Sequence, residues 1–72
     1  MGRLRVLSGR EVCQILERQG FREVRRRGSH MQRPDPASGT VTVVVPDHDE
    51  LKTGTLLSIV RQSRIPRTAF ES

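Results

Sequence analysis

The first periodic segment of the chain has apolar residues at helical spacing, and its stripe consists of Val12, Ile15 and Leu16. Ser8 precedes the stripe and Glu11 stands three residues after Ser8, which is the pattern of a capping box at a helix start. Gly20 follows the last periodic residue, and glycine readily adopts the left-handed conformation that ends many helices. The pattern predicts a helix over about residues 9–19.

After this helix the pattern changes to the alternation of β-strands, and we expect extended runs over 21–27, 30–33 and 40–45. Gly28 and Ser29 separate the first two runs as a Gly-X pair, which is typical of a two-residue hairpin turn. The segment P-D-P-A-S-G separates the second run from the third, and its two prolines and glycine favour another turn. The run T-V-T-V-V-V has the highest β-branched content of the chain, and Pro46 ends it.

A second helix is predicted near the C-terminus, with Thr53 or Thr55 as its cap and an apolar stripe formed by Leu56, Leu57, Ile59 and Val60. A last helical turn is expected between Pro66 and Phe70. The order of elements is therefore α-β-β-β-α, in a single domain spanning 1–72. Because each helix has one apolar stripe and the sheet one apolar face, we expect an α+β fold with a three-stranded antiparallel sheet and both helices packed on one face.

Strand parity assigns side chains to the two faces of the predicted sheet. The third strand has one all-valine face, which must be the buried one, formed by Val41, Val43 and Val45. Met31 is the apolar residue of the second strand, so hydrophobic matching turns it inward. Its neighbours His30 and Gln32 then point outward.

The same reasoning predicts which residues surround His30. If Gly28 and Ser29 are the whole turn, Arg27 lies opposite His30, Arg25 lies opposite Gln32, and Val24 is buried. The outer face would then carry Glu23, Arg25, Arg27, His30, Gln32 and Thr42. A cation beside a histidine favours the neutral imidazole, which is the form that accepts a proton in general base catalysis.

The charge distribution favours a polyanionic partner. Lys and Arg together number 13 against 8 Asp and Glu, for a net charge of +5, and all but one of the 13 are arginines. Most of the excess lies in residues 1–34, and a localised arginine-rich patch suits bidentate contacts to phosphates. A solvated charged surface without a partner remains the alternative. The chain has only two Phe and neither Trp nor Tyr, which argues against base stacking as the binding mode.

A second phosphate contact is expected at the start of the second helix, around Lys52, Thr53, Gly54 and Thr55, where free N–H groups and the helix dipole favour an anion. The alternative is a helix cap and nothing more. Cys13 cannot form an internal disulfide, and we expect it to be a small, half-buried residue of the first helix. No apolar run is long enough for a membrane span or a secretory signal, so a cytoplasmic location is expected.

An ordered set of motifs resembles the HicA (YcfA-like) toxin family from about Leu7 to Phe70. The motifs are S-G-R-E-V, L-E-R-Q-G-F, G-S-H, V-T-V-V-V-P-D-H and E-L-K-T-G-T-L-L-S-I-V-R-Q. The resemblance implies a double-stranded-RNA-binding-domain-like fold, cleavage of mRNA without a metal or other cofactor, and neutralisation by a HicB-like antitoxin protein. It also implies that His30 is catalytic, and it matches Gly28 and Ser29 as the turn and His48 as the histidine after the strand-ending proline. His48 is a candidate accessory residue, and the alternative is a residue that hydrogen-bonds to hold its loop.

Three positions depart from the family pattern. The loop from Asp47 to Glu50 is shorter than usual, which would displace His48; Gln32 replaces an aliphatic or aromatic residue; and Arg64 stands where a helix-terminating glycine is common. None of these changes touches His30.

The chemistry expected from the residues and the resemblance together is attack of a ribose 2′-oxygen on its own phosphorus, with His30 as general base and arginines stabilising the phosphoryl charge. RNA contacts are assigned to Arg25, Arg27, Gly28, Ser29, Lys52 and Thr55. A metal site composed of His30, Asp47, His48 and Asp49 is an alternative in composition only. Two other functions stay open: a non-catalytic nucleic-acid-binding module that uses the same face, and a protein-interaction domain that docks an acidic partner.

Overall fold

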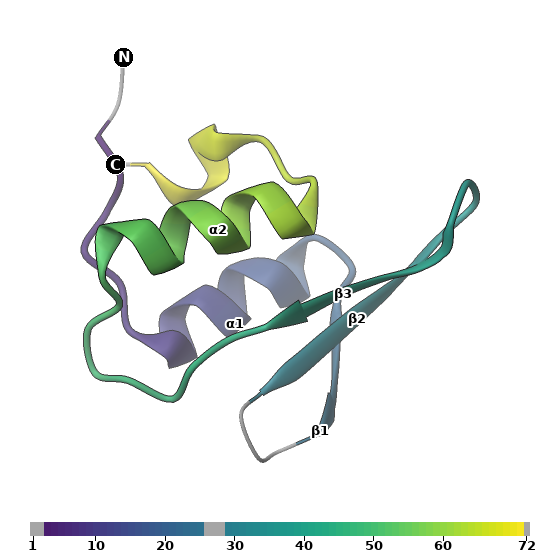
Figure 1. The fold of residues 1–72 in the computed structure, drawn as a ribbon, viewed down its shortest axis with the longest axis horizontal. Helices are drawn as coiled ribbons and strands as arrows, with labels where there is room; N and C mark the ends of the chain where they lie inside the picture. The colour runs from purple at the N-terminus through teal and green to yellow at the C-terminus, as the bar shows by residue number, and fades with distance from the viewer. Residues whose placement is uncertain (1–2, 26–28, 72) are drawn as a thin grey trace.

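The computed structural model describes residues 3–25 and 29–71, and the predicted α-β-β-β-α order is confirmed (Figure 1). The elements are α1 (Gly9–Arg18), β1 (Arg22–Arg25), β2 (His30–Asp35), β3 (Gly39–Val44), α2 (Thr53–Ser63) and the 3-10 helix η1 (Arg67–Phe70). The three strands form one antiparallel sheet in the order β1-β2-β3. The fold is therefore α+β.

Helix α1 begins and ends as its sequence predicts. The Ser8 side chain accepts a hydrogen bond from the Glu11 amide at 3.1 Å, and the Glu11 carboxylate accepts one from the Ser8 amide at 3.0 Å, so the capping box is complete. Gly20 has a φ of 93°, a conformation that a residue with a Cβ rarely adopts. The helix buries its apolar stripe, and Cys13 is buried beside it.

One hydrophobic core holds both helices against the same face of the sheet. It combines side chains of α1 and α2 with the predicted inner face of β2 and β3, and it includes Val12, Leu16, Met31, Val41, Val43, Val45, Leu56 and Ile59. Both phenylalanines of the chain, Phe21 and Phe70, are also buried in it. The inward orientation predicted for Met31 and the valines is thus confirmed. His30, on the alternate parity, lies on the other face.

The register of β1 differs from the prediction. Arg25 lies opposite His30, and Arg22, not Arg25, lies opposite Gln32. A register shift between Glu23 and Arg25 adds one residue to β1, and His30 pairs with Arg25 instead of with Arg27, as a two-residue turn would require. Because a shift of one residue exchanges the two faces of a strand, Val24 is 51% exposed and not buried as predicted.

Strand β2 continues through Pro34, where a turn was predicted. The Val45 amide donates to the Ser29 carbonyl at 3.1 Å, and this bond fixes which residues of β2 face β3. By alternation, the backbone N–H and C=O groups of Ser29, Met31 and Arg33 point to β3, whereas those of Pro34 point to the β1 side. The pairing of β1 with β2 stops at Arg22 and Gln32, so no β1 carbonyl lies opposite Pro34 to accept the N–H that proline lacks.

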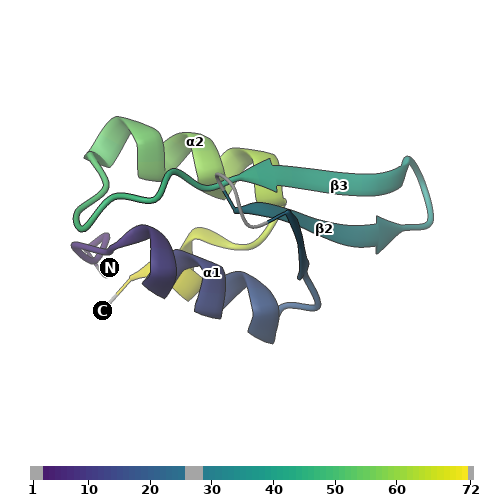
Figure 2. The ribbon, with the colours of Figure 1, turned by 90° about the horizontal axis from the view of Figure 1, so that it is seen from below.

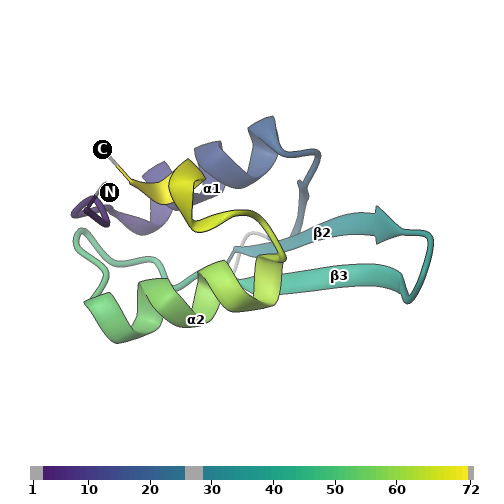
Figure 3. The same cartoon turned by 90° about the horizontal axis from the view of Figure 1, so that it is seen from above.

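Helix α2 differs from the prediction at its start. Its N-cap is Lys52, with no side-chain hydrogen bond, so neither Thr53 nor Thr55 caps the helix. It ends at Arg64, which has a left-handed φ of 60°. The Arg64 guanidinium lies 2.7 Å from the Asp35 carboxylate, at the tip of the β2–β3 hairpin. The ion pair therefore joins the end of α2 to a hairpin that extends past both helices (Figures 2 and 3).

The loop after β3 and the two ends of the described chain pack against neighbouring segments. The Gly9 amide donates to the His48 carbonyl at 2.9 Å, and the Leu51 amide donates to the Leu7 carbonyl at 2.8 Å. Leu4 forms an isolated antiparallel bridge with Glu71. The two hydrogen bonds hold the loop against the start of α1, and the bridge joins the two ends of the described chain.

Candidate functional site

His30 is the first residue of β2 and lies on the sheet face opposite the helices, which agrees with the placement predicted from parity. Its register partners are Arg25 on β1 and Val44 on β3. The side chain is partly exposed, whereas the adjacent Met31 is completely buried. His30 therefore lies on the face of the sheet that the helices do not cover, while the opposite face packs into the core.

The outer face of the sheet is more apolar than the sequence suggested. By register it carries the positions of Arg22, Arg25, His30, Gln32, Pro34, Thr40, Thr42 and Val44. Val24, the extra residue at the register shift, has no register partner and lines a shallow pocket with Arg22 and Gln32. Glu23 was predicted for this face, but it pairs with Met31 and therefore has the parity of the inner face. Val24 and Val44, on the two strands that flank His30, are 51% and 48% exposed.

Arginines approach this face in a different arrangement from the predicted one. Arg22 belongs to it by register, although it was not among the residues predicted for this face. Arg25 is opposite His30 in the backbone pairing. The other predicted members of the turn, Arg27 and Gly28, lie outside the described residues. The sequence contains one sign against the predicted register, because Arg26 would fall on the inner face of a regular strand over 21–27.

Ser29 links the histidine's strand to α1, a contact that the sequence did not indicate. Ser29 lines a cavity of about 340 Å³ together with Cys13 and Gln14 of α1, Glu23 of β1 and Asp47. Burial raises the pKa of the Cys13 thiol, a hydrogen bond from the Ser29 side chain opposes that rise, and the Glu23, Glu17 and Asp47 carboxylates add to it. Cys13 is thus buried more fully than predicted, and it contacts the residue that immediately precedes His30.

His48 lies in the loop that follows β3, and its side chain is exposed. Its backbone is well held: the amide donates to the Pro46 carbonyl at 3.0 Å, and the carbonyl accepts from Gly9. The two hydrogen bonds fix the backbone of this loop at His48, and the His48 side chain points to solvent.

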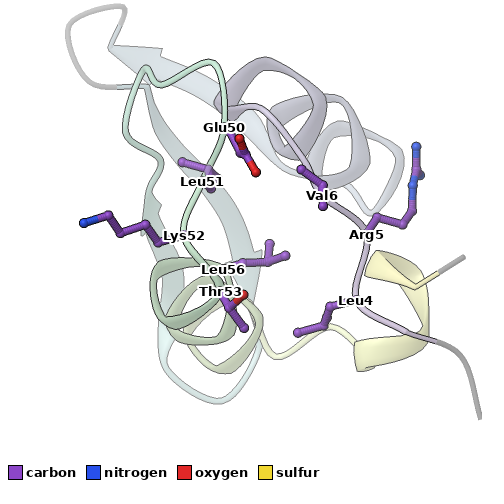
Figure 4. Close-up of a pocket in the computed structure, with 8 residues that line it drawn as sticks. All are labelled: Leu4, Arg5, Val6, Glu50, Leu51, Lys52, Thr53 and Leu56. Carbon is purple, nitrogen blue, oxygen red and sulfur yellow. The ribbon is translucent and has the colours of Figure 1, made fainter.

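Lys52 and Thr53 line a cavity of about 440 Å³, and none of its lining residues belongs to the sheet. Figure 4 shows Val6 and Leu56 pointing into this cavity, and the charged ends of Arg5 and Lys52 pointing away from it. Thr55, in the first turn of α2, is partly buried. The proposed phosphate contact at α2 is thus separate from the His30 face.

The candidate metal ligands do not come together. Within residues 3–25 and 29–71, no three His, Cys, Asp or Glu side chains are grouped so as to hold a metal ion, and this includes His30, Asp47, His48 and Asp49. Among the helices of the described segments, none combines the length and the apolar character that crossing a bilayer requires.

Comparison with known proteins adds one finding. The sequence profile described as "HicA toxin of bacterial toxin-antitoxin" matches residues 9–65, which is well over half of the chain and covers α1, the sheet and α2. No curated protein and no solved structure matches the chain. The matched range contains both histidines.

Proposed function

The chain belongs to the HicA family, the toxins of bacterial toxin–antitoxin pairs, and on this premise we propose that it is an endoribonuclease that cleaves mRNA. Membership makes it the toxin of such a pair and implies a cognate antitoxin. The nuclease activity, the mRNA substrate and the role of His30 are our proposals.

The observation that carries the proposal is the position of His30. It is partly exposed on the open face of the sheet, directly opposite Arg25 in the strand register, while Arg22 lies on the same face. A base reachable by an extended polyanion and flanked by arginine positions is what cleavage next to a phosphate requires. The core behind Met31 supports a fixed location for the histidine backbone.

In the proposed reaction, His30 accepts the proton of a ribose 2′-hydroxyl. The 2′-oxygen forms a bond to the adjacent phosphorus, and the bond from phosphorus to the 5′-oxygen of the next nucleotide breaks. The products are a 2′,3′-cyclic phosphate and a 5′-hydroxyl, once the leaving oxygen has taken a proton from solvent. A positioned base contributes about 10²- to 10⁴-fold to such a step, and cationic donors stabilise the charge on the phosphoryl oxygens.

We assign RNA binding to Arg25 at the end of β1 and to Arg27, Gly28 and Ser29 before His30, with Lys52 and Thr55 as a second contact and His48 as an accessory residue. The assignment is supported by the net charge of +5 and by the burial of both phenylalanines, which removes the two aromatic rings as stacking platforms. Binding would then depend on phosphates and 2′-hydroxyls, with weak sequence preference.

We propose further that the cognate antitoxin is a HicB-like protein that covers the His30 face. Arginine positions on this face would attract acidic side chains of the partner, so association would slow as salt rises. The exposed Val24 and Val44 on either side of His30 supply apolar area for the same contact.

The test is an RNA cleavage assay with the purified chain and its His30→Ala variant, each checked for folding by circular dichroism. Cleavage by the wild type and its loss in His30→Ala, with RNA affinity reduced only modestly, is the expected result. Arg18→Ala is the control, since it removes a charged side chain from an exposed position of α1, away from the His30 face. Full cleavage by folded His30→Ala would overturn the catalytic assignment, and RNA binding without cleavage by the wild type would favour a non-catalytic RNA-binding module.

A further inference from the structure

Strand β3 forms one edge of the sheet. In the described part of the chain, β3 pairs with β2 on one side and with no strand on the other. Figures 2 and 3 show the outer half of the β2–β3 hairpin beyond the ends of both helices, so α1 and α2 do not cover that part of the edge. The edge is therefore open to another chain.

The alternation of hydrogen-bonded pairs between β2 and β3 shows which backbone groups of β3 are left unpaired at the edge. The bond from the Val45 amide to the Ser29 carbonyl makes 29–45 a hydrogen-bonded pair, and the register then gives 31–43, 33–41 and 35–39 as the others. The alternate residues of β3, Thr40, Thr42 and Val44, point their N–H and C=O groups to the open side. All three side chains are exposed.

The two edges of the sheet are protected to different degrees. Proteins block edge strands with charges, prolines, bulges or short length, because an open edge pairs with other chains. Edge strand β1 has four residues, a register shift and three charged side chains, Arg22, Glu23 and Arg25. Edge strand β3 has six residues, GTVTVV, without a charge, a proline or a shift in register. An unprotected, β-branched edge is expected to have a partner.

We propose that an extended segment of the cognate antitoxin pairs with β3 as a fourth strand of this sheet. The partner is implied by family membership, so the inference does not depend on the nuclease chemistry proposed above. A strand added beside β3 would run next to Val44, the residue directly opposite His30. Strand addition uses main-chain hydrogen bonds for affinity and alternate side chains for specificity.

The chemistry of β3 also describes the segment that fits it. Its side chains facing the outer side would lie against Thr40, Thr42 and Val44, which favours β-branched or other apolar residues there. Acidic residues at its ends would suit the positive net charge of this chain. The fit requires no change in the helices.

Amide hydrogen exchange tests the proposal at single residues. The chain is measured as its His30→Ala variant, alone and with its cognate antitoxin. Free amides of Thr40, Thr42 and Val44 should exchange fast, whereas those of Val41 and Val43 are already bonded to β2. On complex formation the three edge amides should become protected. Because the experiment measures amide exchange and not RNA cleavage, its result does not depend on the proposed nuclease activity.

Two variants at one position separate the backbone from the side chain. Thr42→Pro removes an edge N–H without breaking the ladder to β2, as Pro34 already does on the neighbouring strand. Thr42→Val is the matched control, because it keeps the N–H and the branched Cβ. Thr42→Pro should weaken antitoxin binding by about 10-fold or more, and Thr42→Val by less than about 3-fold. Protection of the Val43 amide verifies that each variant is folded.

Four outcomes overturn the proposal. They are the absence of any complex, a complex in which the three edge amides still exchange freely, equal affinities of the two folded Thr42 variants, and protection of the edge without the antitoxin. In the last case, protection that rises with the concentration of the chain, together with the mass of a dimer, would identify a second copy as the occupant. Protection by an added oligoribonucleotide would identify RNA.

Discussion

Gly9 and Pro46 are in direct contact: a Cβ at position 9 would overlap the carbonyl oxygen of Pro46. The Gly9 amide also donates to the His48 carbonyl at 2.9 Å, so the first residue of α1 is the point where the loop after β3 is attached. Glycine is needed here because of close backbone approach and not because of an unusual φ.

Gly9→Ala should lower the free energy of unfolding by about 1–3 kcal/mol, because the added methyl must displace the backbone at Pro46. Gly54→Ala is the matched control. Gly54 is also helical, no neighbouring atom lies within 4 Å of the position that a Cβ would take, and alanine there should stabilise by about 0.4–1 kcal/mol. Urea unfolding of both variants checks the pair, and stabilisation by Gly9→Ala would contradict the close approach at Pro46.

Arg64 ends α2 with a φ of 60°, which disfavours residues other than glycine. Arg64→Gly and Arg64→Ala both lose the ion pair with Asp35, but only glycine relieves the left-handed conformation. Arg64→Gly should therefore be more stable than Arg64→Ala by about 1 kcal/mol in urea unfolding. Equal stabilities would show that the backbone conformation carries no cost at this position.

Asp35 predicts acid sensitivity at the hairpin tip. Hydrogen bonds from the Ser38 hydroxyl at 2.6 Å and the Ala37 amide at 3.3 Å, with the Arg64 guanidinium, hold the pKa of its carboxyl below the ordinary 3.8. A lowered folded pKa contributes stability above the unfolded value, and that stability is lost as pH falls through the folded pKa.

Asp35→Asn should accordingly lower stability at neutral pH and flatten the decline of the urea midpoint below about pH 4. Asp49→Asn, in the exposed loop after β3, is the charge-matched control. A decline that is as steep in Asp35→Asn as in the wild type would assign the acid sensitivity to other carboxylates, of which Glu11 at the capping box also has a lowered pKa.

The arginines near His30 should affect RNA binding more than those on α1. Arg22→Ala and Arg25→Ala are each expected to weaken binding to all RNA sequences and to reduce the slope of log affinity against log salt by about one unit for each phosphate that the variant no longer neutralises. Arg10→Ala and Arg18→Ala remove equal charge from exposed positions of α1. Equal losses of affinity in both pairs would indicate that only net charge matters. Arg27→Ala extends the series to the turn.

Attack by a 2′-hydroxyl predicts how cleavage responds to substrate and chelator. RNA should be cleaved in EDTA, DNA of the same sequence should survive, and an RNA with a single 2′-deoxy substitution should resist cleavage at that site. Product ends should be 2′,3′-cyclic or 3′-phosphates, as mass spectrometry can determine. Activity that is lost in EDTA and restored by Mg²⁺ or Mn²⁺ would instead indicate metal-assisted chemistry.

The elements that the sequence predicts well are those with local signals. The Ser8–Glu11 capping box and Gly20 fix both ends of α1 within two residues, and the valine alternation of β3 identifies the buried face. The outward placement of His30 follows from the burial of Met31 alone. These signals depend on residues adjacent in the chain, so no tertiary information is needed to read them.

The predictions that fail depend on tertiary contacts. A Gly-X pair suggests a two-residue turn, but the shift between Glu23 and Arg25 pairs Arg25 with His30, and no local pattern marks that shift. Lys52 is the N-cap of α2 without a side-chain hydrogen bond, and the Leu51 amide before it is bonded to the Leu7 carbonyl, far away in the sequence. The cavity between Cys13 and Ser29 likewise joins residues 16 positions apart, with no local pattern to mark it.

The bridge between Leu4 and Glu71 brings the two ends of the described chain together, and the Arg5 amide adds a bond to the Phe70 carbonyl at 2.9 Å. In Figures 1 to 3 both ends of the described chain lie on the side of the molecule remote from the β2–β3 hairpin. Fusion tags at either end will thus leave the β3 edge accessible. A short linker joining the ends would permit circular permutation, with new termini opened at the hairpin tip between Asp35 and Gly39.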